Sequence, residues 1–409
     1  MNFELTSEQK EAKIRFRKFV DKYVVPNAST YDRIEETPLE LIKAMANEGY
    51  LSALIPPKYF AKGTDTDTHN QDDRGKNIGY DNCAHIGKEM DSITWGLLCE
   101  EIGHASGSLV SLLTVHSMVI QALLKWGTEA QRSHWLPLLA TGEVIGGFGL
   151  TEVKTGSDAK NAQTTAVQDG DSYIISGQKK WISFGQVARL FLILAQVDGK
   201  ATAFLIERER EGFSTESING MLGFRSAMLA TLNMNNCRIP ASNMVGKIGF
   251  GFSHVAGTAL DQGRYCIAWG CLGLAQGCVD ASLAYSTERK QFGVSLKEHQ
   301  LIQELIADMI TQTQAARMLC YNAAFLKENK DPSLIMETSM AKYFASRAAL
   351  KVASDAVQIH GANGCSDTYP VERHFRDAKI MEIIEGSNQM QQIIISRYGY
   401  QRYLSSQPK

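Results

Sequence analysis

The stretch L-F-L-I-L-A-Q-V-D-G-K-A-T-A-F-L-I-E, residues 190–207, decides the fold. Two apolar runs flank the pair Asp198-Gly199, and an Asp-Gly pair in this setting is the strongest short signal for a β-hairpin. The run S-Y-I-I-S-G follows a similar turn, Q-D-G-D, at residues 168–171. We therefore expect a compact antiparallel β domain, a barrel or a sandwich, over residues 143–247.

Helical patterns lie on both sides of this β region. Thr6 or Ser7 can cap a first helix, apolar residues then recur at helical spacing, and we expect helix over residues 7–55 and again over 91–140. Within 7–55, the segment P-L-E-L-I-K-A-M-A-N-E-G-Y predicts a second helix that ends at Gly49 as its C-cap. The polar, Gly- and Asp-rich segment 57–90 predicts a long surface loop. Long helices return from residue 250 to 405. The expected fold class is thus α+β and multidomain: helical over 1–142, β over 143–247 and a helix bundle over 248–409.

The composition is that of an ordinary globular protein. The chain has 409 residues, of which 44% are hydrophobic and 21% charged, and this length requires two or three packed subdomains. A net charge of -2 carries no signature of nucleic-acid or membrane binding, and the polar N-terminus does not resemble a signal peptide. We found no run of about 18 apolar residues and expect no spanning helix.

The cysteines and histidines give no indication of a metal centre. Eight cysteines occur without a C-x-x-C pair, and the nine histidines are scattered. This pattern favours reduced, mostly buried thiols in a cytoplasmic protein over disulfides or a metal site.

Several short segments could hold a ligand, although each also has a purely structural explanation. A Gly-rich turn, a core Trp and a helix end neutralised by Arg289 and Lys290 would explain three of them. The last segment, residues 381–393, contains Glu385 between isoleucines and a Gly-Ser break. A carboxylate among apolar neighbours is costly unless it is paired, protonated or used. The segments are G-F-G-L-T-E-V-K-T-G-S-D (147–158), K-K-W-I-S-F-G (179–185), E-R-K-Q-F-G (288–293), V-Q-I-H-G-A-N-G (357–364) and M-E-I-I-E-G-S-N-Q-M-Q-Q-I (381–393).

Taken together and in this order, the segments resemble the acyl-CoA dehydrogenase family over nearly the whole chain. The elements that match are L-T-E-x-x-x-G-S-D, W-I-S, E-R-K-Q-F-G, Q-I-H-G-A-N-G, Y-P-V-E-R-H-F-R-D-A-K-I and I-I-E-G-S-N-Q-M-Q. The resemblance implies a C-terminal four-helix bundle, bound FAD and removal of two hydrogens from the α and β carbons of an acyl thioester.

The resemblance also implies roles for residues around the last segment. Glu385 corresponds to the base that removes the α proton, and its backbone N–H to a donor for the thioester oxygen. Some relatives carry the base just before the arginine of L-D-x-x-R, where this chain has Gly263 before Arg264, so Glu385 has no rival there. We expect Gly263 to leave room for a substituent, Arg264 to support the region electrostatically, Gly386 to permit a sharp turn and Ser387 to cap the next helix.

The FAD contacts implied by the resemblance fall into two groups. The first surrounds the flavin and phosphates within one subunit; the second reaches the cofactor from a neighbouring subunit, which predicts a homodimer or homotetramer. The first group is Leu150, Thr151, Ser157, Trp181, Ser183, Ser387 and Gln389, and the second is Arg289, Gln291, Phe292, Gln358 and Gly361.

The chain departs from the family pattern near the substrate channel. T-E-V-K-T-G-S-D stands in place of T-E-P-G-A-G-S-D, so Val153, Lys154 and Thr155 replace a tight turn, and the 57–90 loop is long. These departures resemble the branch that oxidises acyl groups tethered to a carrier protein in polyketide or nonribosomal peptide pathways, for example a hydroxymalonyl thioester.

The main alternative is α,β-dehydrogenation of a short-chain acyl-CoA, with an electron-transferring flavoprotein or oxygen as the electron acceptor. A non-enzymatic flavin-binding or nucleic-acid-associated protein is an alternative of another class, and it would require a lost base or a basic C-terminal patch. Glu385 is present and the C-terminal tail is only mildly basic.

Overall fold

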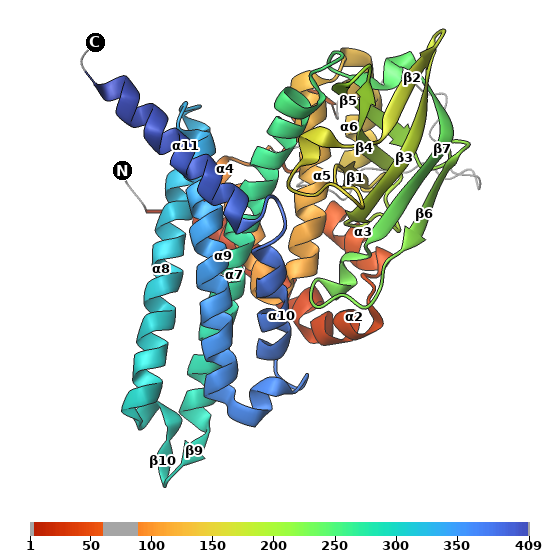
Figure 1. The fold of residues 1–409 in the computed structure, drawn as a ribbon. Coiled ribbons are helices and arrows are strands. Elements are labelled where there is room, and N and C mark those ends of the chain that lie inside the picture. The colour runs from red at the N-terminus through yellow and green to blue at the C-terminus, as the bar shows by residue number, and fades with distance from the viewer. Residues whose placement is uncertain (1–3, 60–88, 408–409) are drawn as a thin grey trace.

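The computed structural model describes residues 4–59 and 89–407. A β domain stands beside a bundle of long helices, and helices from the N-terminal part of the chain lie between and beneath them (Figure 1). Most of the loop predicted over 57–90 falls outside the described residues.

The first helices are shorter than the sequence predicted. Thr6 caps α1 (Ser7–Phe19) through a capping box with Gln9, as expected for one of the two candidate caps. The separate helix predicted from Pro38 to Gly49 is confirmed, since Pro38 precedes the third α-helix and Gly49 has φ 76°. The helical pattern before it breaks up more than expected, and Glu35 at φ 57° ends the second α-helix. The elements are η1 (Val20–Val24), η2 (Val25–Asn27), α2 (Ala28–Ile34), α3 (Leu39–Asn47) and η3 (Pro57–Tyr59).

Three further helices confirm the prediction for residues 91–140: α4 (Ser92–Ala105), α5 (Gly107–Trp126) and α6 (Glu129–Ala140). α4 lies against the long helix α7 (Gly257–Glu288) with the two backbones in contact. A Cβ on Gly103 would lie 2.9 Å from the Cα of Gly270, and one on Gly273 would lie 2.8 Å from the carbonyl carbon of Glu100. Side chains at these positions would therefore force α4 away from α7, the helix that carries Gly263.

The β domain confirms the predicted hairpin. Strands β4 (Leu190–Val197) and β5 (Lys200–Glu207) pair antiparallel, and Asp198 and Gly199 between them both have positive φ, 48° and 72°. The sheet as a whole corrects the prediction of an antiparallel domain, since β1 (Gly146–Gly149) and β2 (Thr165–Asp169) both pair parallel with β4. The order along the sheet is β6-β7-β3-β2-β4-β5-β8, with β3 (Ser172–Ile182), β6 (Phe213–Ser217), β7 (Ala230–Pro240) and β8 (Met244–Val245).

The C-terminal part contains the predicted four-helix bundle. Helices α7, α8 (Gln300–Glu328), α9 (Leu334–His360) and α10 (Val371–Met381) pack together, and α11 (Asn388–Ser406) packs on α9 at the end of the bundle (Figure 1). A small hairpin, β9 (Lys290–Gln291) with β10 (Val294–Ser295), projects from the other end. The remaining short helices are η5 (Ala159–Asn161), η6 (Arg225–Ala227), η7 (Ala241–Asn243), η8 (Gly251–Ala256), η9 (Leu296–Glu298) and η10 (Gly361–Cys365).

Two of the described helical stretches, Gly107–Trp126 and Gly251–Glu288, are long and apolar enough to cross a membrane. Neither stretch is an unbroken apolar run in the sequence. Their apolar windows are 89% and 78% buried inside the protein, so these stretches form its core. Among residues 4–59 and 89–407, six of seven free cysteines are buried, and no group of three or more potential metal ligands occurs.

Candidate active site

Glu385 lies on the loop between α10 and α11, residues 382–388, which we call the Glu385 loop. Glu385 and Gly386 both have positive φ, 55° and 84°. This backbone conformation suits glycine, so Gly386 permits the sharp turn as predicted, whereas at Glu385 it costs on the order of 1 kcal/mol. Strain of this kind at a residue with an ionisable side chain indicates that the surrounding structure imposes the conformation.

The carboxylate of Glu385 lies directly against α7 at Gly263. A Cβ on Gly263 would overlap Oε2 of Glu385, and it would lie 2.6 Å from Cδ of Glu385 and 3.0 Å from Sδ of Met118 on α5. The expectation that Gly263 leaves room for a substrate substituent is therefore corrected, because the Glu385 carboxylate fills this space. Gly263 is needed at this position so that the carboxylate can lie against the helix.

The electrostatic surroundings make Glu385 a stronger base than a carboxylate in water. Its Oε2 is buried and has no hydrogen-bond partner among residues 4–59 and 89–407. Burial raises the pKa of Glu385 to about 7, against the opposing charges of Arg264 and Lys342, while Cys266 adds to the rise. A carboxylate with a pKa close to neutral can accept a proton efficiently near neutral pH.

Lys342, a buried lysine that was not predicted as a site residue, holds the Glu385 loop in place through hydrogen bonds. Lys342 on α9 is fully buried, and its Nζ donates hydrogen bonds to the carbonyl oxygens of Glu382 (3.3 Å) and Gly386 (3.0 Å) and to Oδ1 of Asn388 (3.2 Å). Gln391 on α11 also donates to the carbonyl oxygens of Glu385 and Gly386. A lysine at core spacing in S-M-A-K-Y-F-A-S, residues 339–346, was the signal available in the sequence.

On the β domain, the two predicted flavin segments lie side by side. The N–H of Lys180 donates to the carbonyl oxygen of Thr151 at 2.9 Å. The buried Lys179 donates to the carbonyl oxygen of Leu150 and to Oε1 of Glu152. Burial alone would raise the pKa of Glu152, but hydrogen bonds from Lys179, Thr164 and Gln163 lower it to about 2. This buried ion pair, also missed in the sequence, fixes the strand exit that carries Leu150 and Thr151.

Groups at the predicted FAD positions are available for a ligand. The hydroxyls of Thr151, Ser157, Ser183 and Ser387 form no hydrogen bond within residues 4–59 and 89–407. Ser387 occupies the N-cap position of α11 but makes no capping hydrogen bond, which corrects its predicted structural role.

Trp181 and Gln389 are both exposed, and Trp181 has φ 64°. The free hydroxyls and the exposed indole ring match the donors and the flat apolar contact that a flavin nucleotide needs. The residues present therefore fit FAD.

The second group of predicted FAD contacts lies at the other end of the bundle. Arg289 caps the end of α7, and Phe292 in the β9–β10 hairpin is 95% exposed. Arg289 is about 39 Å along α7 from Gly263, at about 1.5 Å per residue. One flavin ring cannot contact both ends of this helix. The exposed Gln291 and Gln358, and Gly361 at φ 61°, lie at the hairpin end, where Tyr285 of α7 stacks on His360 of α9 at 4.2 Å.

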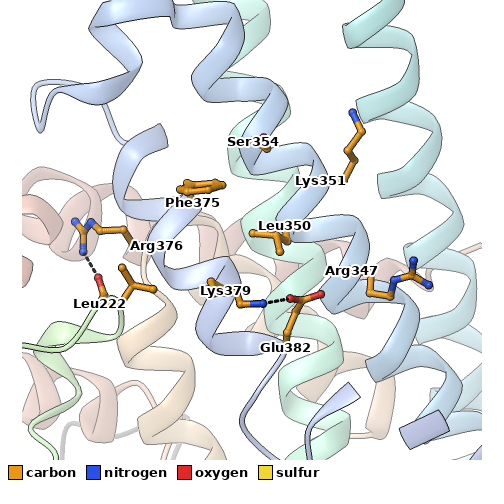
Figure 2. A pocket seen from close by; sticks show the side chains of 9 residues that line it. All are labelled: Leu222, Arg347, Leu350, Lys351, Ser354, Phe375, Arg376, Lys379 and Glu382. Atoms are coloured by element: carbon orange, nitrogen blue, oxygen red, sulfur yellow. Dashed lines mark hydrogen bonds and ion pairs between the residues drawn. The ribbon is translucent and has the colours of Figure 1, made fainter. Parts of the chain in front are cut away.

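A surface groove of about 520 Å³ between α9 and α10 is lined by cationic side chains, most of which are already neutralised. The cationic side chains are Arg347, Lys351, Arg376 and Lys379. In Figure 2, Lys379 bonds to Glu382 and Arg376 to the carbonyl oxygen of Leu222. Three of the four cations are already paired with carboxylates of this chain. The pairs are Arg376 with Asp32 and Glu372, Lys379 with Glu382, and Lys351 with Asp355.

Comparison with known proteins accounts for the fold. The three domain models of the acyl-CoA dehydrogenase family match this chain: the N-terminal domain over residues 6–69 and 83–143, the middle domain over 147–237 and the C-terminal domain over 249–399. The short-chain specific acyl-CoA dehydrogenase of Clostridium acetobutylicum is 36% identical, covering 97% of this chain and 99% of that protein. An acyl-CoA dehydrogenase of Bacillus subtilis is 34% identical, covering 96% and 98%.

Solved structures agree with these relatives, and each of the following covers 97% of this chain and 99% of its own. Butyryl-CoA dehydrogenase from Megasphaera elsdenii superposes with a TM-score of 0.87 at 32% identity. A chain in a structure of the electron transferring flavoprotein of Acidaminococcus fermentans superposes with 0.88 at 34%, and a prolyl acyl carrier protein oxidase with 0.86 at 26%.

The chain belongs to the acyl-CoA dehydrogenase family. It is an FAD-dependent oxidoreductase that acts on acyl thioesters.

Proposed function

We propose that this enzyme oxidises a short acyl thioester and that Glu385 removes the α proton. The observation that carries the proposal is the buried, unpartnered Oε2 of Glu385, held at Gly263 with a pKa of about 7. The short-chain specificity of one relative and the butyryl-CoA dehydrogenase activity of a structural neighbour support a short acyl group.

The residues of the chain divide the work of the reaction. When bound, FAD supplies the two-electron oxidant that takes the β hydrogen as hydride. The Glu385 carboxylate receives the α proton at Oε2. The backbone N–H of Glu385 forms no hydrogen bond within the described residues, and it is free to donate to the thioester carbonyl oxygen. Arg264 places a positive charge near the carboxylate, which stabilises its ionised form before the proton arrives.

The test of the base is Glu385→Gln. We expect the variant to bind FAD and to lose flavin reduction by butyryl-CoA by about 10³-fold or more, because it removes a positioned base. Glu372→Gln on α10, whose carboxylate pairs with Arg376 away from the loop, is the control. Rapid anaerobic reduction of Glu385→Gln at a rate near that of the wild type would exclude Glu385 as the base.

A carrier protein is the second candidate for the thioester group. The neighbouring prolyl acyl carrier protein oxidase and the altered turn at Val153, Lys154 and Thr155 support it. In that form the substrate would be a small acyl group such as hydroxymalonyl on a phosphopantetheine arm. Matched kinetics with the same acyl group on coenzyme A and on a carrier protein test the candidate, and equal kcat/KM values for both would remove it.

Each FAD site is proposed to be completed by a second subunit of a homodimer or homotetramer. Glu385 lies against Gly263 near the start of α7, whereas Arg289 lies at the end of the same helix, and this separation supports the arrangement. Co-folding of Glu385→Gln with Arg289→Ala gives a mixture of dimers in which about a quarter of the sites regain both intact residues. We expect activity to return to about that fraction. No recovery would mean that each site is complete within one chain.

We propose a cytoplasmic enzyme that passes its electrons to an electron-transferring flavoprotein. The superposition on a chain solved with such a flavoprotein supports this acceptor over oxygen. Turnover in air with stoichiometric peroxide and no stimulation by an added electron-transferring flavoprotein would contradict it.

A further inference from the structure

We propose that Lys342 is a positioning residue that clamps the Glu385 loop on both sides of the base and places a buried positive charge beneath its carboxylate. The inference rests on the proposed role of Glu385 as base. Lys342 lies on α9, whereas Glu385 lies on the loop, with its carboxylate against Gly263 of α7.

The geometry uses every donor that the ammonium group has. Lys342 Nζ donates to the carbonyl oxygen of Glu382, three residues before the base, and to that of Gly386, one residue after it. The third bond goes to Oδ1 of Asn388, the first residue of α11, which also accepts from Ser346 Oγ at 2.9 Å. Three acceptors from one short loop thus converge on a single cation.

The backbone conformation explains why such a clamp is needed. Two successive residues with positive φ, Glu385 and Gly386, would relax readily in a free loop. Fixing the carbonyl groups of Glu382 and Gly386 to one point of α9 constrains the chain before and after Glu385. The direction of its carboxylate toward Gly263 follows from that constraint.

The charge of Lys342 acts as well as its hydrogen bonds. A buried ammonium that donates to no carboxylate within the described residues is costly, and burial lowers the pKa of Lys342 to about 8. A neutral amide or hydroxyl could satisfy carbonyl oxygens at lower cost, so the positive charge is the feature that remains to be explained. Lys342 is one of two cations that oppose the rise in the Glu385 pKa.

The titratable and charged groups around this pair lie on α7, the Glu385 loop and α11. They are Asp261, Arg264, Cys266 and Cys271 on α7, Glu382 on the loop and Tyr398 on α11. Of these, Arg264 is the other cation, so the field at the carboxylate depends on Arg264 and Lys342 together.

The test compares Lys342→Met and Lys342→Gln in the FAD-loaded enzyme. Met removes the charge and all three hydrogen bonds, and Gln restores up to two donors without the charge. Lys351→Met is the matched control, since Lys351 is a surface lysine of the same helix that pairs with Asp355. The direct readout is an infrared titration of the Glu385 carboxyl, identified by the band that Glu385→Gln removes.

We expect the titration midpoint of Glu385 to rise by on the order of one pH unit in both Lys342 variants and to stay unchanged in Lys351→Met. The value of kcat should fall at least about tenfold in Lys342→Met with little change in KM, and Lys342→Gln should recover part of it. Loss of kcat with an unmoved midpoint would reduce Lys342 to a structural role and overturn the proposal.

The proposal is likewise overturned if neither kcat nor the titration midpoint of Glu385 changes in the Lys342 variants. Should Lys342→Met fail to fold, Lys342→Gln supplies both measurements. If Glu385→Gln turns out to be fully active, the proposed base is wrong, but the infrared midpoint still decides whether Lys342 controls the carboxyl.

Discussion

The substitution Gly263→Ala tests the carboxylate site with the addition of a single methyl group. The new Cβ would overlap Oε2 of Glu385 and lie 2.6 Å from its Cδ. An ordinary contact between these atoms needs about 3.4 Å or more, so the carboxyl carbon must retreat by at least about 0.8 Å. The atoms that give way belong to the end of a flexible side chain, so we expect the fold to tolerate the change.

The expected effect is therefore on catalysis. A base displaced by about 1 Å loses about 10²-fold in rate, and the rate of anaerobic flavin reduction in a stopped-flow experiment should fall by that factor. The unfolding free energy should change by no more than about 1 kcal/mol, because alanine gains helix propensity over glycine while the carboxylate loses its position.

Gly257→Ala on the same helix is the control. Among the described residues, a Cβ there comes within 4 Å of the carbonyl oxygen of Phe252 alone, at 3.7 Å, and the variant should keep the wild-type rate. A Gly263→Ala enzyme with wild-type flavin reduction, or a crystal structure of it with the carboxylate unmoved, would refute the reasoning.

Two further changes test the electrostatics. The pKa of Glu385 is raised from 4.5 to about 7, so the unfolding free energy of the wild type falls as pH rises between these values. The unfolding free energy of Glu385→Gln, measured by urea titration, should match that of the wild type near pH 4 and exceed it above pH 7 by up to about 3 kcal/mol. Glu152→Gln leaves the buried Lys179 without its carboxylate, so the variant should lose about 3 kcal/mol of stability and release FAD more readily, and Glu152→Gln/Lys179→Met should regain part of the melting temperature.

The sequence predicted most of the fold because its local signals agree with the final structure. The Asp198-Gly199 turn has the two positive φ values that its residues favour, and Thr6 caps the first helix. The mixed pairing of the sheet could not be predicted, because β1 joins β4 in parallel across residues 150–189, which contain β2 and β3, and a parallel pair has no hairpin turn to reveal it. A new helix at Pro38 was predicted, but the end of α2 at Glu35 was not, because it depends on tertiary contacts such as the ion pair of Glu35 with Arg225.

The candidate base was predictable, whereas its immediate neighbours were not. Glu385 stood out as a carboxylate in an apolar run, and the motif around it supplied a role. Gly263 was assigned to an empty space, because a sequence does not reveal which side chain will point at a missing Cβ. Lys342 and Glu152 come from α9 and from the strand exit, and their partners lie far along the chain, at Gly386 and Lys179 for example.

Three departures from ordinary local preference meet at one place in this molecule, and they share a cause. Glu385 has a left-handed backbone conformation, Gly263 occupies a position inside helix α7, and Lys342 is buried on α9. Each is unfavourable by itself, and none improves the packing of the core. Together they place a desolvated carboxylate against a helix while two positive charges keep it ionisable. Departures that are costly separately and consistent jointly are expected where a protein maintains a reactive group, which is why the same residues identify the site.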